Sequence, residues 1–196
     1  MHPAPKNIFI YGDRVALFFT KIKRKIAHLI ISRNDFSLNQ NHAILICMEK
    51  KIYESWNEGD TYRFGEKMAA AAGAGSLYCL EGDLGVGKTV FTQGFAHGLG
   101  IDEPVTSPTF TIVQEYETGR LPLYHFDVYR LADPEELEEI GYEEYFFGEG
   151  VCLIEWPSRI EELIPSDAIR ITIEKELSRG FDYRKITVTG GRVDHE

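Results

Sequence analysis

A glycine-rich segment between an apolar run and a helix-forming run constrains this chain more than any other feature. It matches the pattern GxxxxGK[S/T], in which glycines let the backbone turn tightly and bring successive N–H groups to phosphate oxygens. In this pattern the lysine contacts the β and γ phosphates, and the hydroxyl residue binds the accompanying Mg²⁺. The segment therefore predicts a nucleoside triphosphate site. Its residues are Gly82, Asp83, Leu84, Gly85, Val86, Gly87, Lys88 and Thr89.

The flanking residues give this loop the context that it requires. Residues 76–80 read as a short buried strand, and Phe91, Phe95 and Leu99 recur at helical spacing before Gly100 ends the helix. A helix that starts at the loop directs its positive dipole end toward the same phosphates. Strand, loop and helix thus follow one another in the order of a phosphate-binding loop.

Length and cysteine usage narrow the class of protein. The 196 residues suit one well-buried domain plus an appendage. The cysteines Cys47, Cys79 and Cys152 form no CxxC pair, and two lie in apolar runs, which favours reduced core residues over disulfides or metal ligands. The chain has no run of about 18 apolar residues and no secretion signal pattern at its start. We therefore expect a cytoplasmic protein without a membrane span.

The net charge of −10 is unevenly distributed. Residues 1–47 carry seven Lys or Arg against two Asp, or +5, so residues 48–196 carry 14 basic against 29 acidic residues, or −15. Because a body this acidic repels a polyanion, we expect any contact with RNA to be local or made by a partner.

The basic segment, residues 1–47, is distinct from the rest of the chain. Between Asp13 and Ser32 apolar residues follow helical spacing, which indicates a basic amphipathic helix. Three interpretations remain open: a helix that docks on a partner or membrane surface, an extra helix folded on the body, or upstream sequence included by a misplaced start codon. We favour the last, because we expect the domain that holds the glycine-rich loop to span residues 48–196 and to begin at Met48.

The pattern of the remaining residues predicts a three-layer α/β fold of the P-loop NTPase type, with a mostly parallel central sheet plus antiparallel hairpins. A helix capped by Asp60 or Thr61 runs to Gly73, and a short acidic helix opens at Asp133 and Pro134. A brief helix is expected at residues 159–163. Two strands, 110–116 and 121–126, are expected to form a hairpin, and a strand at 151–154 is expected in the centre of the sheet. The final pair of strands is expected at 169–173 and 186–188.

Two of the predicted strands end in an acid, Asp127 and Glu155. Either side chain could bind the metal at the carboxyl end of a strand, and spacing does not rank them. His125 shares a face with Asp127, so it could support that carboxylate, or it could be a hydrogen-bonded core residue. Thr109, in Ser107-Pro108-Thr109, follows the loop helix as a switch hydroxyl would, with an ordinary turn as the alternative.

Four ordered motifs, LEGDLGVGKT, TSPTFT, YHFDVYRL and the strand ending IEW, resemble the TsaE family, also called YjeE, over residues about 50 to 190. That family consists of small bacterial P-loop ATPases that act with the TsaD and TsaB proteins in threonylcarbamoylation of adenosine beside the anticodon of certain tRNAs. The resemblance implies that ATP hydrolysis serves a partner complex and that tRNA is contacted indirectly. The absence of NKxD and DxxG motifs, which disfavours a Ras-type GTPase, also favours ATP.

Matched motif by motif, the resemblance implies ATP binding by residues 82–89 and Mg²⁺ binding by Thr89 and Glu155. It implies that Asp127 acts near the metal or the attacking water, with Lys88 and Thr109 as the other catalytic residues.

The resemblance also covers two residues outside these motif cores. Trp156 matches the family's tryptophan after the glutamate, with packing below the site as the alternative. Arg184 looks like the family's late arginine near the nucleotide. Residues 1–47 have no counterpart in the family.

The sequence thus predicts a Mg-dependent ATPase that works in tRNA modification. Two alternatives remain: a P-loop small-molecule kinase, which needs an acceptor pocket, and a nucleotide-sensing adaptor that binds ATP without hydrolysing it.

Overall fold

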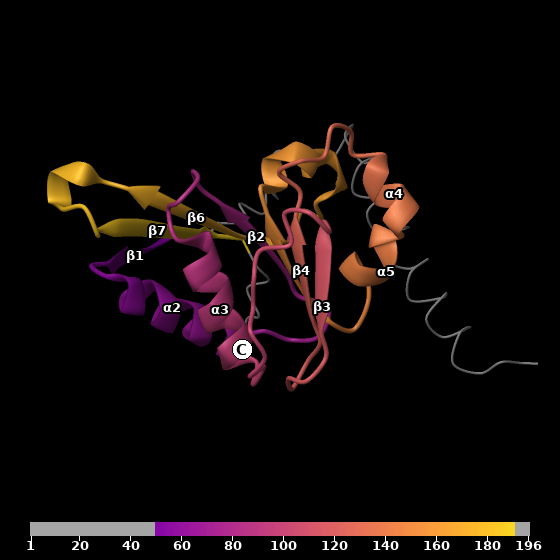
Figure 1. Ribbon diagram of the computed structural model, residues 1–196, viewed down its shortest axis with the longest axis horizontal. Helices are drawn as coiled ribbons and strands as arrows, with labels where there is room; N and C mark the ends of the chain where they lie inside the picture. Colours follow the sequence, from indigo (N-terminus) through magenta and orange to yellow (C-terminus); the bar gives the residue numbers. More distant parts are fainter. Residues whose placement is uncertain (1–49, 191–196) are drawn as a thin grey trace, which may run out of the picture. The chain divides into compact units, whose positions relative to one another are not determined.

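The computed structural model describes residues 50–190 and contains one seven-stranded sheet (Figure 1). The predicted helix at 13–32 and Cys47 lie outside the described residues. The strand order is β1-β7-β6-β2-β5-β4-β3. The strands are β1 (Lys51–Ser55), β2 (Leu77–Glu81), β3 (Val113–Tyr116), β4 (Leu123–Asp127), β5 (Val151–Glu155), β6 (Ile169–Lys175) and β7 (Arg184–Thr189).

The centre of the sheet is parallel and both edges are antiparallel. β2 lies between β5 and β6 and pairs with both in parallel, and β4 continues the parallel region beyond β5. β3 returns antiparallel to β4 at one edge, while β7 and β1 are added antiparallel beyond β6 at the other. The predicted mostly parallel sheet with antiparallel hairpins is therefore confirmed.

Helices cover both faces of the sheet, as the three-layer prediction requires (Figure 1). Two long helices pack on one face over a core that includes Phe91, Phe95 and Ile171. Two short helices and a 3₁₀ segment pack on the other face around Phe126 and Ile154. The elements are α2 (Glu58–Ala70), α3 (Lys88–Gly98), α4 (Glu136–Ile140), α5 (Tyr142–Phe146), and the 3₁₀ helices η1 (Pro157–Leu163) and η2 (Leu177–Arg179).

Helices α2 and α3 pack with their backbones in close approach. A Cβ at Gly94 would lie 2.0 Å from the Tyr62 carbonyl oxygen, and one at Gly65 would lie 2.3 Å from the Phe91 oxygen. Neither position has room for a side chain, so these glycines let α3, the helix after the glycine loop, lie against α2.

Three details differ from the sequence-based expectation. α2 begins at Glu58 and is capped by Asn57, whose Oδ1 accepts from the Asp60 N–H at 3.0 Å, rather than by Asp60 or Thr61. Residues 110–112 form a turn, not the start of β3, because the Ile112 N–H donates to the Pro108 oxygen. The edge strand β1 was not predicted, since its pattern of mostly exposed residues gives little periodic signal.

The expectation for the cysteines is met at the two that the structure describes. Cys79 and Cys152 are free and buried in β2 and β5, in agreement with the prediction of reduced core thiols. Burial raises the pKa of the Cys79 thiol to about 12 and shifts that of Cys152 in the same direction. Within residues 50–190, no helix is long and apolar enough to cross a membrane.

Candidate active site

The glycine loop connects the end of β2 to the start of α3, and its backbone takes conformations that side chains disfavour. Gly82, Gly85 and Gly87 have φ values of 150°, 69° and 109°. Gly82 also lies against β6, where an added Cβ would be 2.5 Å from the Ile173 oxygen. Gly87 caps α3, so the free N–H groups of the first turn and the positive end of the helix dipole face the loop.

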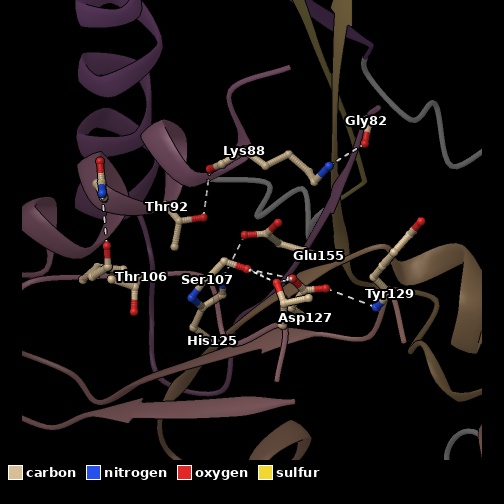
Figure 2. A network of polar contacts seen from close by, with 12 residues as sticks. Gly82, Lys88, Thr92, Thr106, Ser107, His125, Asp127, Tyr129 and Glu155 are labelled. Carbon is tan, nitrogen blue, oxygen red and sulfur yellow. Dashed lines mark hydrogen bonds and ion pairs between the residues drawn. The ribbon is translucent and has the colours of Figure 1, made fainter. Parts of the chain in front are cut away.

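The Lys88 side chain is folded back into this loop. Its Nζ donates to the carbonyl oxygen of Gly82 at 2.6 Å (Figure 2). It also donates to the carbonyl oxygen of Asp83 at 3.1 Å and lies 3.9 Å from the centre of the Trp156 ring. Only 6% of the residue is exposed. Burial lowers the pKa of Lys88, while the nearby carboxylates of Glu155 and Asp127 act in the opposite direction. The ammonium is thus held where a phosphate group could replace the two carbonyl oxygens.

The two acids predicted at strand ends lie side by side. β4 and β5 pair in parallel with Asp127 opposite Glu155, so both side chains point to the same face of the sheet. Leu123 and Leu153, which precede them at even spacing, belong to the core under α2 and α3. The acids therefore face the side of the sheet that carries Lys88, although they are only 4% and 3% exposed.

Asp127 is held by the segment after α3. Its Oδ2 accepts from the Ser107 hydroxyl at 2.7 Å and from the Thr109 hydroxyl at 2.6 Å, and Oδ1 accepts from the Tyr129 N–H at 3.1 Å (Figure 2). The predicted switch threonine and the predicted catalytic aspartate are thus in direct contact. Ser107 is an additional partner whose role sequence reasoning did not assign, although it lies in the same motif.

His125 contacts Glu155 rather than Asp127. Its Nε2 lies 2.9 Å from Glu155 Oε1, and the ring is fully buried. Residues two apart on one strand are roughly 7 Å apart, whereas neighbouring strands are only about 4.8 Å apart. The imidazole therefore meets the acid of the adjacent strand, an arrangement that depends on strand order.

The backbone is strained next to both acids. Ile112, whose carbonyl oxygen accepts from the Asp127 N–H at 2.9 Å, has φ of 65°, a rare conformation for a β-branched residue. Trp156, directly after Glu155, has φ of 63°. Its indole lies 4.9 Å from Tyr129 and under the Lys88 ammonium. Strain of this kind is concentrated at functional sites, because the surrounding structure must hold it in place.

A cavity of about 230 Å³ adjoins the glycine loop. Arg184, the first residue of β7, lines it and donates from Nε to the Val86 oxygen at 2.8 Å, so the structure brings this predicted residue to the loop. The sequence did not predict that the start of α2 lines this cavity. The only signal for it was a polar residue ahead of an acidic first turn. The lining residues are Asn57, Glu58, Thr61, Gly85, Val86, Gly87, Val90, Asp182 and Arg184.

The rest of the loop presents its tip to solvent. Asp83, Leu84 and Gly85 are exposed, with Leu84 at 83%, while Val86 is buried and Thr89 is half-buried at the start of α3.

The residues present fit a magnesium ion that keeps water and phosphate ligands better than a metal ion bound by protein side chains alone. No cluster of three or more His, Cys, Asp or Glu side chains with metal-binding geometry occurs within residues 50–190. Mg²⁺ does not require one, because it is usually bound through one or two protein oxygens together with water and substrate phosphates. The Thr89 hydroxyl and the Glu155 carboxylate are oxygen donors of this type.

Comparison with known proteins identifies the family of this chain. The family model "Threonylcarbamoyl adenosine biosynthesis protein TsaE" matches residues 55–185. The TsaE protein of Bacillus subtilis is 49% identical over 142 residues, which cover 72% of this chain and 87% of the relative. The TsaE protein of Treponema pallidum is 46% identical, covering 66% of this chain and 93% of the relative.

A solved structure is also similar to this chain. The crystal structure of YdiB from Bacillus subtilis superimposes with a TM-score of 0.64 at 43% identity, covering 74% of this chain and 88% of that one. The match of the family model to most of the described residues, together with these relatives, shows that this chain belongs to the TsaE family.

Proposed function

We propose that this protein is a Mg-dependent ATPase that acts in threonylcarbamoyladenosine biosynthesis on tRNA. One observation carries the hydrolytic part of the proposal: Asp127 and Glu155 lie opposite each other on adjacent parallel strands, on the face of the sheet that carries Lys88. Carboxylates at the carboxyl ends of parallel strands beside a phosphate-binding loop can serve both a metal and an attacking water. The pathway assignment follows from the names of the relatives.

ATP binding is assigned to residues 82–89 and Arg184. The backbone N–H groups of the loop and of the first turn of α3 bind the phosphates. When ATP binds, the Lys88 ammonium donates to phosphate oxygens in place of the Gly82 and Asp83 carbonyl oxygens. Its present position already directs its N–H groups toward the loop. The neighbouring cavity, which Arg184 lines, is the place for the nucleoside.

Thr89 and Glu155 would hold Mg²⁺, which supplies charge neutralisation on the phosphates. Asp127 would orient the attacking water, with Thr109 acting as the switch residue. Because the Ser107 and Thr109 hydroxyls both donate to Asp127 Oδ2, movement of this segment toward a nucleotide would also free a carboxylate oxygen for water. The contact between switch and acid thereby couples nucleotide occupancy to catalysis.

The partners proposed are the TsaD and TsaB proteins, with tRNA contacted through their complex and not directly. The charge of −15 over residues 48–196 supports this, since such a surface repels RNA. A cytoplasmic location is part of the same proposal. Hydrolysis by the isolated chain is expected to be slow, because the Asp127 oxygens are occupied by the protein's own donors until a partner or nucleotide moves them.

Release of inorganic phosphate from ATP tests the proposal, measured for the full chain alone and with TsaD and TsaB. We expect the partners to increase the rate and Glu155→Ala to abolish the increase while ATP still binds. Phosphate transfer to a metabolite without release of free phosphate would indicate a kinase. Full support of tRNA modification by a Glu155→Ala chain would indicate a non-hydrolysing adaptor.

A further inference from the structure

The imidazole of His125 is a buried polar group for which packing gives no explanation. It lies in the middle of β4 with 0% exposure, and its Nδ1 has no hydrogen-bond partner within the part of the chain that the structure describes. An unsatisfied buried nitrogen destabilises a fold, whereas an apolar side chain at the same place would not. The single polar contact of the ring is therefore the feature to explain.

The donor and the acceptor of that hydrogen bond can be assigned. A carboxylate can accept but cannot donate, so the His125 Nε2 carries the proton and donates to Glu155 Oε1 at 2.9 Å. Both side chains are almost fully buried, which strengthens the hydrogen bond and fixes the orientation of the carboxylate. No described residue donates to the second oxygen, Oε2.

The two acids of the site are held in different ways. Asp127 is held by hydroxyls of the 107–109 segment, a connection without helix or strand structure. Glu155 is held by His125, which is part of the central sheet. A change in the connecting segment can therefore free Asp127 Oδ2 without disturbing Glu155.

We propose that His125 is a positioning residue that orients Glu155 for Mg²⁺. This inference rests on the proposed function. The hydrogen bond to Oε1 fixes the orientation of the carboxylate and leaves Oε2 to accept the cation. Outer partners of this kind commonly determine how well a ligating group binds its metal.

The test compares two substitutions in the full chain, His125→Gln and His125→Asn, each of which replaces the imidazole with an amide. The amide nitrogen of Gln can reach the position of Nε2, whereas that of Asn lies near Nδ1 and cannot reach Glu155. ATP affinity is measured by equilibrium titration, first in EDTA and then over a range of Mg²⁺ concentrations. His97→Gln is the matched control, because His97 is exposed on α3, where it contacts Glu66.

We expect His125→Asn to raise the half-saturating Mg²⁺ concentration by about 10- to 100-fold, with ATP affinity in EDTA unchanged. His125→Gln and His97→Gln should stay near the wild-type value. An equal increase for Asn and Gln, or no increase for Asn, would overturn the inference. If the Asn chain does not fold, His125→Met, which fills similar space without an N–H donor, takes its place under the same criteria.

The same titration separates failure of this inference from failure of the proposed function. A wild-type chain whose ATP binding does not respond to Mg²⁺ would contradict both. A Mg-dependent wild type with an unaltered His125→Asn chain would contradict only the role of His125.

Discussion

Replacing Gly94 by alanine tests whether the contact between α2 and α3 supports both the fold and the nucleotide site. The new Cβ would lie 2.0 Å from the Tyr62 oxygen and 2.8 Å and 3.0 Å from the Tyr62 carbonyl carbon and Cα. All three atoms belong to the backbone, so no rotamer change relieves the clash. Ordinary contact begins at 3.4 Å, and α3 must therefore move away from α2 by roughly 1.4 Å.

The expected loss of stability follows from two opposing effects. Overpacking of this kind costs about 3 kcal/mol, the upper part of the usual range, because backbone cannot yield locally. Alanine recovers about 1 kcal/mol through its better helix propensity. A net loss of about 2 kcal/mol corresponds to a decrease in Tm of about 4 to 8 °C for a protein of this size.

Thermal unfolding and ATP titration together provide the assay. Gly73→Ala is the control, since its Cβ would meet only the Ser76 hydroxyl oxygen, at 3.8 Å, and we expect unchanged stability. ATP affinity should fall only for Gly94→Ala, because α3 carries Lys88 at its first turn. A Gly94→Ala chain with wild-type Tm and ATP affinity would refute the packing argument.

Three further outcomes are expected. In equilibrium titration, Lys88→Ala should weaken ATP binding by about 10- to 100-fold, the equivalent of one charge-assisted hydrogen bond. Unchanged binding would contradict the assignment of the loop to ATP. Thr109→Val removes one of the two hydroxyl donors to Asp127. Partner-stimulated phosphate release should therefore fall at least several-fold, while ATP affinity stays within about twofold of the wild-type value. An unaltered rate of phosphate release would contradict the switch role of Thr109. The Cys79 and Cys152 thiols, whose pKa values are raised by burial, should react with Ellman's reagent only after denaturation, and rapid reaction of either in the native chain contradicts the described core.

Sequence patterns predicted the features of this protein that depend on neighbouring residues. The strand at residues 76–80, the loop at 82–89 and the helix after it were correct because glycine conformations, apolar runs and helical spacing are local properties. The prediction of β5 in the sheet centre succeeded for the same reason, since a short run of apolar residues at 151–154 indicates burial on both faces.

Local patterns failed where a distant contact changed the outcome. Residues 110–116 have strong strand propensity throughout, yet the first three form a turn that brings Ser107 and Thr109 to Asp127. The capping residue of α2 was misplaced because several polar residues near its start satisfy the same pattern, and only the backbone geometry selects Asn57.

By itself, the sequence determined that this chain has a glycine loop between a strand and a helix, an α/β fold and two acids at strand ends, because each of these follows from patterns within continuous segments. Only the tertiary structure decided which residues work together. The parallel pairing of β4 with β5 sets Asp127 opposite Glu155. The close spacing between these strands also brings His125 within hydrogen-bonding distance of Glu155. These contacts join residues about 30 positions apart, and no local pattern encodes them.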